Sequence, residues 1–498
     1  MLVLRHATGM ASRASSLARG QGRFSTLSIN SLPKAVVECD YAVRGAVLQR
    51  ADQLEAELSH GSTILPFDQI VRCNVGNLQA TGQEPILFHR QVLACLLEPS
   101  LAHDTALFPE DVRERALQYL SGMNDGRVGA CSQSQGHRVF REEVADFLTA
   151  RDAAETDADD IFFTDGISAA VKLVMQMVIR GPEDGVLLPI PQYPLYSETL
   201  RLLGGQPVGY FLDEEAGWTI PLEELERAVS EFRASGGTPR AMVVINPGNP
   251  TGHVLTREVM KGVLEFAERE RLMVLADEVH QDNIHVDGKT WCSFRSLAQE
   301  LGTTVEVFSL QSCSTGVVGE CSLRSGVVHC ENLGAAVKDQ MCKLASVNLG
   351  SNVLGQALMA SVLRDPPRDG PSRPKYDEQR ELIRVSLRRK AKLVTQRLNA
   401  IDGITCQPVE GALYAFPRVI IKGYTMKKAI SFATPADKIY CLEMVERTGI
   451  ATVPGSGFGQ RPGHFHFRMT LLQDEETLTK VLDGLEKFHS EHAYGWFK

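Results

Sequence analysis

Short strand-like runs alternate with helical patterns through the middle of this 498-residue chain. The apolar runs cover 186–190, 241–245, 272–276 and 305–308. Between the second and third runs, the apolar residues of 259–267 recur at helical spacing, and Thr256 stands at the N-cap position. Strands that alternate with helices form a mostly parallel sheet with both faces covered, so we expect an α/β fold. Ligands bind such sheets at the carboxyl ends of the strands.

A second, smaller domain is expected after a loop rich in proline at 365–374. A predicted helix over 379–400 places Leu387, Ala391, Val394 and Leu398 on one face. Strand-like runs follow at 411–417 and 450–454. We therefore predict a large domain over 98–378, and a small α/β domain made of 379–498 together with the N-terminal segment 25–97.

The N-terminus differs in composition from the rest of the chain. Residues 1–37 contain no Asp or Glu but include Arg5, Arg13, Arg19 and Arg23 among several serines. This pattern is typical of a mitochondrial transit peptide, with cleavage after Phe24, and it predicts a location in the mitochondrial matrix. A disordered basic tail and a plastid transit peptide are the alternatives.

Composition limits the possible partners. The net charge of −9 argues against nucleic acid as a partner, and no apolar run is long enough to span a bilayer. The eleven cysteines show no CxxC motif and no metal-ligand spacing, so we expect reduced thiols and no metal. Packing is a more common role than reactivity for Cys131, Cys313 and Cys321.

From about Tyr41 to the C-terminus, a series of motifs resembles the alanine aminotransferases, which are fold-type-I pyridoxal phosphate (PLP) enzymes. The matching segments are 41–45, 190–196, 246–252, 275–279, 281–283, 309–321, 453–461 and 467–470. The resemblance implies a mostly parallel seven-stranded sheet between helices in the large domain. It also implies a homodimer, because fold-type-I sites are built across a dimer interface.

The resemblance assigns a role to each retained site residue. Tyr193 would stack on the pyridine ring, Asn249 would bond the phenolic oxygen of PLP, and Asp277 would pair with the pyridine nitrogen. Arg468 would bind the substrate carboxylate through its planar fork. Ser312 and Arg324 would bind the phosphate.

The central reactive residue of the family is replaced. Thr315 stands where the family has the lysine that forms the Schiff base with PLP, and threonine cannot form an imine. Other departures from the family pattern affect the same site. Compared with the family's loop, whose backbone N–H groups hold the phosphate, about four residues are missing before Asp165. Family tyrosines are replaced by Cys131 and His280, a Tyr-Met pair by Val317 and Val318, and an arginine by Asn348.

These changes favour a catalytically defective member of the family that serves as a structural or assembly subunit in a mitochondrial complex. PLP is expected not to be bound covalently, and its binding to be weak or lost. A second hypothesis is a sensor that binds an amino acid or keto acid through Arg468. A third is an active alanine:2-oxoglutarate aminotransferase, which would need another lysine, such as Lys338 or Lys343, to reach the cofactor.

Overall fold

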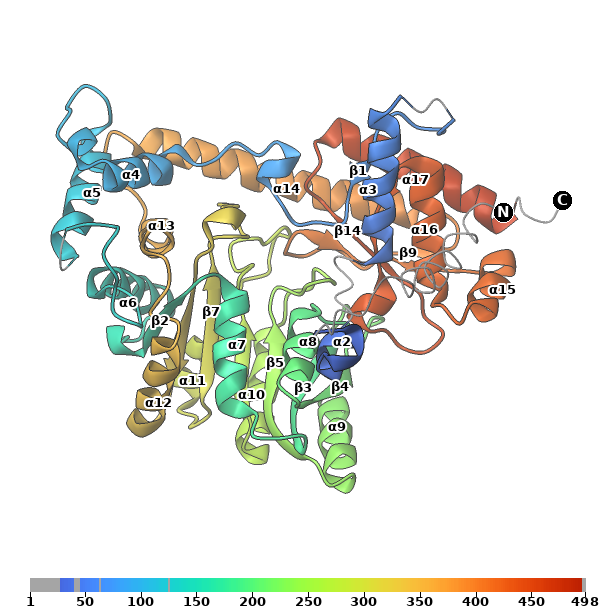
Figure 1. Cartoon of the computed structure of the whole chain (residues 1–498), viewed down its shortest axis with the longest axis horizontal. Coiled ribbons are helices and arrows are strands. Elements are labelled where there is room, and N and C mark those ends of the chain that lie inside the picture. The colour runs from blue at the N-terminus through green and yellow to red at the C-terminus, as the bar shows by residue number, and fades with distance from the viewer. Residues whose placement is uncertain (1–26, 40–44, 62–63, 124–125, 495–498) are drawn as a thin grey trace, which may run out of the picture. The chain divides into compact units, whose positions relative to one another are not determined.

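The computed structural model describes residues 27–39, 45–61, 64–123 and 126–494 (Figure 1). The chain divides into two compact units, of which the first ends at Cys39 and contains the short helix α2 (Lys34–Val37). The second unit begins at Asp40 and carries everything that follows. The predicted transit peptide, 1–24, and the matching segment 41–44 lie outside the described residues.

A seven-stranded sheet forms the centre of the second unit, as predicted. Its strands, in spatial order, are β2 (Ile161–Thr164), β8 (Gly326–Glu331), β7 (Val307–Ser312), β6 (Met273–Asp277), β5 (Thr238–Ile245), β3 (Asp184–Ile190) and β4 (Gln206–Phe211). Only β8 runs antiparallel to its neighbours. The other strands all run in one direction, so their carboxyl ends meet at a single edge of the sheet.

Helices cover both faces of this sheet, because successive strand residues point to opposite sides. Val186 and Leu188 of β3 pack with α7 (Ile167–Val178), α8 (Leu195–Leu202) and α12 (Ala335–Ser346). Leu187, between them, packs with α9 (Leu222–Ala234), α10 (Arg257–Glu270) and α11 (Phe294–Leu301). The predicted cap of α10 is present, since the Thr256 hydroxyl accepts from the Val259 N–H at 3.4 Å.

A second core joins the two ends of the chain. Val47, Ala51 and Leu54 of α3 (Ala46–Ser59) are buried together with residues of the C-terminal segment. The helices of that segment are α15 (Gly423–Ser431), α16 (Ala436–Thr448) and α17 (Glu475–Tyr494). Three small pairings join its strands: β1 (Val71–Arg72) with β12 (Ile450–Ala451), β9 (Ile404–Thr405) with β11 (Arg418–Val419), and β14 (Phe467–Thr470) between β10 (Tyr414–Ala415) and β13 (Val453–Pro454).

A third core contains residues from both sides of the predicted domain boundary at residue 97. Helix α4 (Leu87–Leu97) packs with α5 (Glu110–Gly122), α6 (Arg138–Asp152) and α13 (Val353–Leu363), and not with the small-domain core. The apolar face of α4, which includes Phe88 and Val92, is buried among these helices. Of the predicted segment 25–97, α3, β1 and residues near β1 such as Phe67 and Cys73 pack with the C-terminal segment.

One long helix, α14 (Arg373–Asn399), connects these cores. It begins earlier than the predicted start at 379, because Pro374 lies in its first turn, where a missing N–H costs nothing. Tyr376 belongs to the core of α4 and α5, whereas Ala391, Val394 and Leu398 belong to the small-domain core. Between them, Leu387 packs with Leu78, Leu413, Tyr414 and Leu472 in a small cluster, which we call the bridging cluster.

Candidate functional site

The predicted site residues gather at the carboxyl edge of the sheet. Asp277 ends β6 and Thr315 follows β7. Tyr193 follows β3, Asn249 follows β5, and Asp165 follows β2. Because these strands run in the same direction, residues far apart in the sequence meet at one edge.

Thr315 is tied to the backbone of the neighbouring loop. Its hydroxyl donates to the Val279 carbonyl at 2.8 Å, two residues beyond Asp277. Val317 and Val318, which follow it, are buried in the core of α4, α5, α6 and α13. The side chain at 315 therefore has a structural partner, and its neighbours anchor the loop.

The next two lysines along the chain do not supply the missing amine. Lys338 Nζ donates to Asp160 Oδ1 at 2.5 Å, and Asp160 precedes β2 at the amino edge of the sheet. That edge lies a whole strand away from Thr315, or roughly 13 Å. Lys343 Nζ donates to Gln340 on its own helix, α12, at 3.1 Å.

The carboxyl group of Asp277 is buried and hydrogen-bonded. The Tyr196 hydroxyl donates to its Oδ2 at 2.5 Å, and the Val279 N–H donates to Oδ1 at 3.4 Å. Burial raises the pKa of Asp277, and these two bonds oppose that shift. Asp277 can therefore face a positively charged ring nitrogen, as the resemblance implies, while Tyr196 fixes its orientation.

Glu278, the next residue, points into the interior. Its Oε1 accepts from the Phe294 N–H at 2.7 Å, and its Oε2 accepts from the Ser309 hydroxyl at 2.5 Å. Burial raises the pKa of Glu278 to about 7. His280, which replaces a family tyrosine, is also buried, and its ring lies edge-on to Tyr414 at 5.9 Å. Burial lowers the pKa of His280 to about 4, so it is neutral at pH 7.

Arg468 lies at the other end of the site, on β14. Its guanidinium is buried between two rings, 4.3 Å from the centre of Tyr414 and 4.7 Å from the centre of Phe458. Nη1 donates to Asn249 Oδ1 at 3.0 Å, and Nη2 donates to the Asn74 carbonyl at 2.8 Å. Both side-chain polar atoms of Asn74 are buried without a hydrogen-bond partner among the described residues. A buried cation beside unsatisfied polar atoms suits a small polar ligand such as a carboxylate.

The predicted phosphate end is a short turn. Only Asp165 and Gly166 separate β2 from α7, and Gly166 has a φ of +78°. Arg324 Nη2 donates to the Asp165 carbonyl at 3.2 Å, and a Cβ on Gly166 would lie 2.3 Å from the same nitrogen. The Ser312 hydroxyl donates to the Ser325 carbonyl at 3.2 Å. Arg324 thus lies at the N-terminus of α7, which is suited to an anion, whereas the Ser312 hydroxyl is bonded within its own loop.

The remaining residues singled out from the sequence are Tyr193, Asn348 and three cysteines. Tyr193 is half-buried against the sheet core. Cys131 is exposed, and Asn348 lines a cavity of about 510 Å³ beside Asp165. Cys313 is buried, which raises the pKa of its thiol to about 12 and keeps it protonated. The Cys321 thiol donates to the Ser314 carbonyl at 2.8 Å, which agrees with a packing role.

Neither position 315 nor the next two lysines along the chain offers an amine at the carboxyl edge of the sheet. Position 315 offers a hydroxyl, Lys338 lies at the opposite edge of the sheet, and Lys343 is bonded within α12. Asp277, Asn249 and Arg324 suit the ring and phosphate of a pyridoxal compound, as the resemblance implies.

Several residues of the site were not assigned a role from the sequence, among them Tyr196 and Tyr414. Tyr196 lies within a matching segment but gave no sign that it would bond Asp277. Tyr414, in the predicted strand 411–417, covers Arg468. A buried carboxylate at the end of a strand needs a hydrogen-bond donor. The search for an aromatic hydroxyl buried near that strand end could have suggested Tyr196.

Within the described part of the chain, no group of three or more His, Cys, Asp and Glu residues could hold a metal ion. No helix there combines the length and apolarity needed to cross a membrane.

Comparisons with known proteins agree with this geometry. The family model for aminotransferase class I and II matches residues 100–485. The chain is 42% identical to human alanine aminotransferase 1 over 477 residues, which covers 94% of this chain and 96% of the relative. It is 41% identical over 472 residues to the mitochondrial alanine aminotransferase 1 of Arabidopsis thaliana, covering 93% of this chain and 86% of the relative.

Solved structures share the fold at lower identity. An aminotransferase from Escherichia coli superposes with a TM-score of 0.74 and 22% identity, covering 94% of this chain and 99% of the other. An alanine aminotransferase from Pyrococcus furiosus superposes with a TM-score of 0.73 and 24% identity, covering 92% of this chain and 100% of the other. The matched residues, the sheet order and the site geometry agree: this chain belongs to the alanine aminotransferase family of class I and II aminotransferases.

Proposed function

We propose that this protein does not catalyse transamination and acts as a structural or assembly subunit in the mitochondrial matrix. One observation carries the proposal: Thr315 occupies the position of the essential lysine, and its hydroxyl is bonded to the Val279 carbonyl. In this family the lysine both attaches the cofactor and moves the proton of the reaction. A threonine that donates to a backbone carbonyl does neither.

The rest of the fold supports a stable protein without cofactor. The cores described above are formed by side chains that do not depend on a bound group. We therefore expect a folded homodimer in the absence of PLP, because sites of this fold type are built between two subunits. A mitochondrial location is supported by the acid-free N-terminus and by the mitochondrial relatives from Arabidopsis thaliana and Dictyostelium discoideum.

The test combines size and cofactor chemistry on the full chain without its first 24 residues. Light scattering of the protein, with and without PLP, should give a dimer in both cases. Borohydride treatment after PLP addition, followed by peptide mass spectrometry, should reveal no modified lysine. A stoichiometric adduct at one lysine would refute the proposal and favour an active enzyme, whereas a cofactor-free monomer or aggregate would refute the assembly role.

A second candidate, a carboxylate sensor, is favoured by the geometry of Arg468. Its guanidinium is held by Asn249, Asn74, Tyr414 and Phe458, in a buried position that suits an amino acid or keto acid. Calorimetric titration with alanine, pyruvate and 2-oxoglutarate distinguishes the two candidates. Saturable binding that is lost in Arg468→Lys would favour the sensor, and no heat with any of the three would favour the assembly role.

A further inference from the structure

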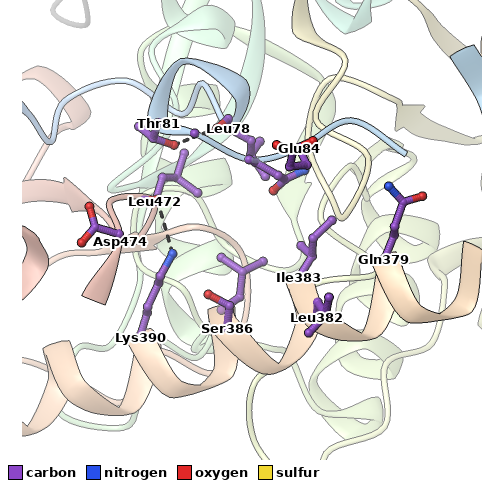
Figure 2. Close-up of a pocket in the computed structure, with 13 residues that line it drawn as sticks. Leu78, Thr81, Glu84, Gln379, Leu382, Ile383, Ser386, Lys390, Leu472 and Asp474 are labelled. Atoms are coloured by element: carbon purple, nitrogen blue, oxygen red, sulfur yellow. Dashed lines mark hydrogen bonds between the residues drawn. The ribbon is translucent and has the colours of Figure 1, made fainter. Parts of the chain in front are cut away.

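A separate cavity of about 310 Å³ lies beside α14, outside the candidate site (Figure 2). One wall is the α14 face that carries Gln379, Ile383, Ser386 and Lys390 at helical spacing. The opposite wall is segment 78–84, and Leu472 and Asp474 close one end. This volume is at the lower end of the range of small-molecule sites.

The floor of the cavity is apolar. Leu78, Leu387 and Leu472 are buried members of the bridging cluster, and Ile383 packs against it. Leu382, at the rim, keeps 64% of its surface exposed. An aliphatic chain placed here would remove apolar surface from water on both the protein and the ligand.

A cation stands at the end closed by Leu472. Figure 2 shows Lys390 reaching from α14 toward Leu472, with Ser386 on the same helix and Glu84 toward the other end. Lys390 Nζ donates to the Leu472 carbonyl at 3.4 Å, a long contact that leaves its other two protons for a ligand. Burial lowers the pKa of Lys390, an effect opposed by Glu475 and Asp474, and an anion beside the ammonium would favour its charged form.

The two acidic residues of the lining form no hydrogen bond with Lys390 in the part of the chain that the structure describes, although Asp474 acts on it electrostatically. Both oxygens of Asp474 accept from Thr477, through its N–H at 2.9 Å and its hydroxyl at 2.6 Å, and so cap α17. Glu84 is exposed and lies beside Leu78 and Ile383, away from Lys390 (Figure 2). A second negative charge on a ligand would therefore meet either the apolar floor or the Glu84 carboxylate.

We propose that this cavity is a second ligand site, which binds a small amphipathic monocarboxylate. Its carboxylate would accept from Lys390 and Ser386, and its aliphatic body would cover Leu78, Ile383 and Leu472. A dicarboxylate or an ammonium ligand is disfavoured, because it would place charge on apolar surface or against a like charge.

The same walls hold the loop that carries Thr315. Gln83 Nε2 donates to the Val317 carbonyl at 3.0 Å, and Gln79 Nε2 donates to the Gly319 carbonyl at 3.2 Å. On the inner side of the bridging cluster, Tyr414 contacts Arg468. A molecule in the cavity would thus restrain segment 78–84, and through it the loop 315–320.

Hexanoate is the probe for the test, with hexanamide as its uncharged counterpart. Calorimetry should give saturable hexanoate binding to the wild type, weakened roughly tenfold in Lys390→Met, because a half-buried charge-assisted bond is lost. Ser386→Phe, which fills the cavity, should abolish hexanoate binding. Lys392→Met is the matched control, since Lys392 is exposed on the same helix and does not line the cavity. Hydrogen exchange of loop 315–320 should slow with hexanoate in the wild type but not in Lys390→Met.

Three outcomes would overturn the proposal. The first is no hexanoate binding to the wild type at millimolar concentration. The second is equal affinity of the wild type and Lys390→Met for hexanoate. The third is binding that is lost in Arg468→Lys and kept in Lys390→Met, which would place hexanoate in the candidate site and not in this cavity.

Discussion

The two ends of the candidate site differ in how deeply they are built into the fold. Arg468 and its aromatic neighbours Tyr414 and Phe458 are buried, and Phe467 and Met469 on either side belong to the small-domain core. At the other end, Arg324 and Asp165 are exposed and Thr315 is half-buried. The end at Arg468, which we call the retained end, thus also supports folding. The end at Thr315 and Asp165, which we call the altered end, could change with little loss of stability. The presence of Arg468 therefore does not by itself reveal whether the residue binds a ligand.

The largest expected effect concerns restoration of activity at the altered end. Thr315→Lys alone should remain far below an active relative in alanine transamination, because the turn at Asp165 still lacks the backbone donors of the family loop. Restoring the missing residues of the phosphate-binding loop before Asp165 together with the lysine should raise the rate more than either change alone. Coupled assays of pyruvate formation measure this.

Removal of the lysine from an active relative, by the matching Lys→Thr change, is the control and should cost about 10⁴-fold or more in kcat. Near-normal activity of Thr315→Lys without the loop would show that the short turn is no obstacle.

At the retained end, Arg468→Met should lower the free energy of unfolding by about 2–3 kcal/mol, because it leaves the buried acceptors of Asn249 and Asn74 unpaired. Urea denaturation measures the change. Arg233→Met, which removes an exposed pair with Glu270, is the control and should cost less than about 1 kcal/mol. A loss no greater than that of the control would mean that Arg468 is kept for binding alone.

The buried Glu278, close to the altered end, should make the stability of the fold depend on pH. Its folded-state pKa is about 7 against an ordinary value of 4.5, so its contribution to stability is fully present below pH 4.5 and is lost as pH rises to about 7. Glu278→Gln should therefore gain stability relative to the wild type between pH 4.5 and 7, and the difference should stay constant above that window. Denaturation curves across this range test it, and parallel curves for the two proteins would contradict the assignment.

The smallest effect is expected at Thr315 itself. Thr315→Val keeps the shape but removes the donor to the Val279 carbonyl, which should cost about 1 kcal/mol. Thr315→Ser keeps the hydroxyl and should lie closer to the wild type. Thermal unfolding of the three proteins ranks them, and a Val variant as stable as the wild type would show that the bond contributes nothing.

Much of the fold could be predicted because its signals are local. The runs 186–190, 241–245 and 272–276 lie in strands of one sheet, and 259–267 is helical, since apolar periodicity reflects burial directly. The packing partner of α4 could not be predicted, because an amphipathic helix shows which face it buries but not against what. The early start of α14 could not be predicted because of Pro374. Proline disrupts the interior of a helix but is tolerated in its first turn.

Within the site, the parallel strands explain why motif residues far apart in sequence converge at one edge. The bond from Thr315 to Val279 and the contact of Arg324 with Asp165 could not be predicted. Both depend on how loops with different sequences approach each other, and no periodic pattern encodes that approach. The sequence indicated which groups would be near the site, and the structure reveals which of them are already bonded to one another.

The pairing of β1 with β12 bears on how the protein is made. Val71 pairs with Ile450, and α3 is buried against α16 and its neighbours, so the small domain needs both ends of the chain. On the ribosome, or during passage through a membrane with the N-terminus leading, α3 emerges long before its partners exist. The central sheet can form first, and the apolar face of α3 stays exposed to solvent until the C-terminal segment is available. Chaperones that shield short apolar segments would therefore act on this protein chiefly at α3, until the C-terminal partners of α3 are released.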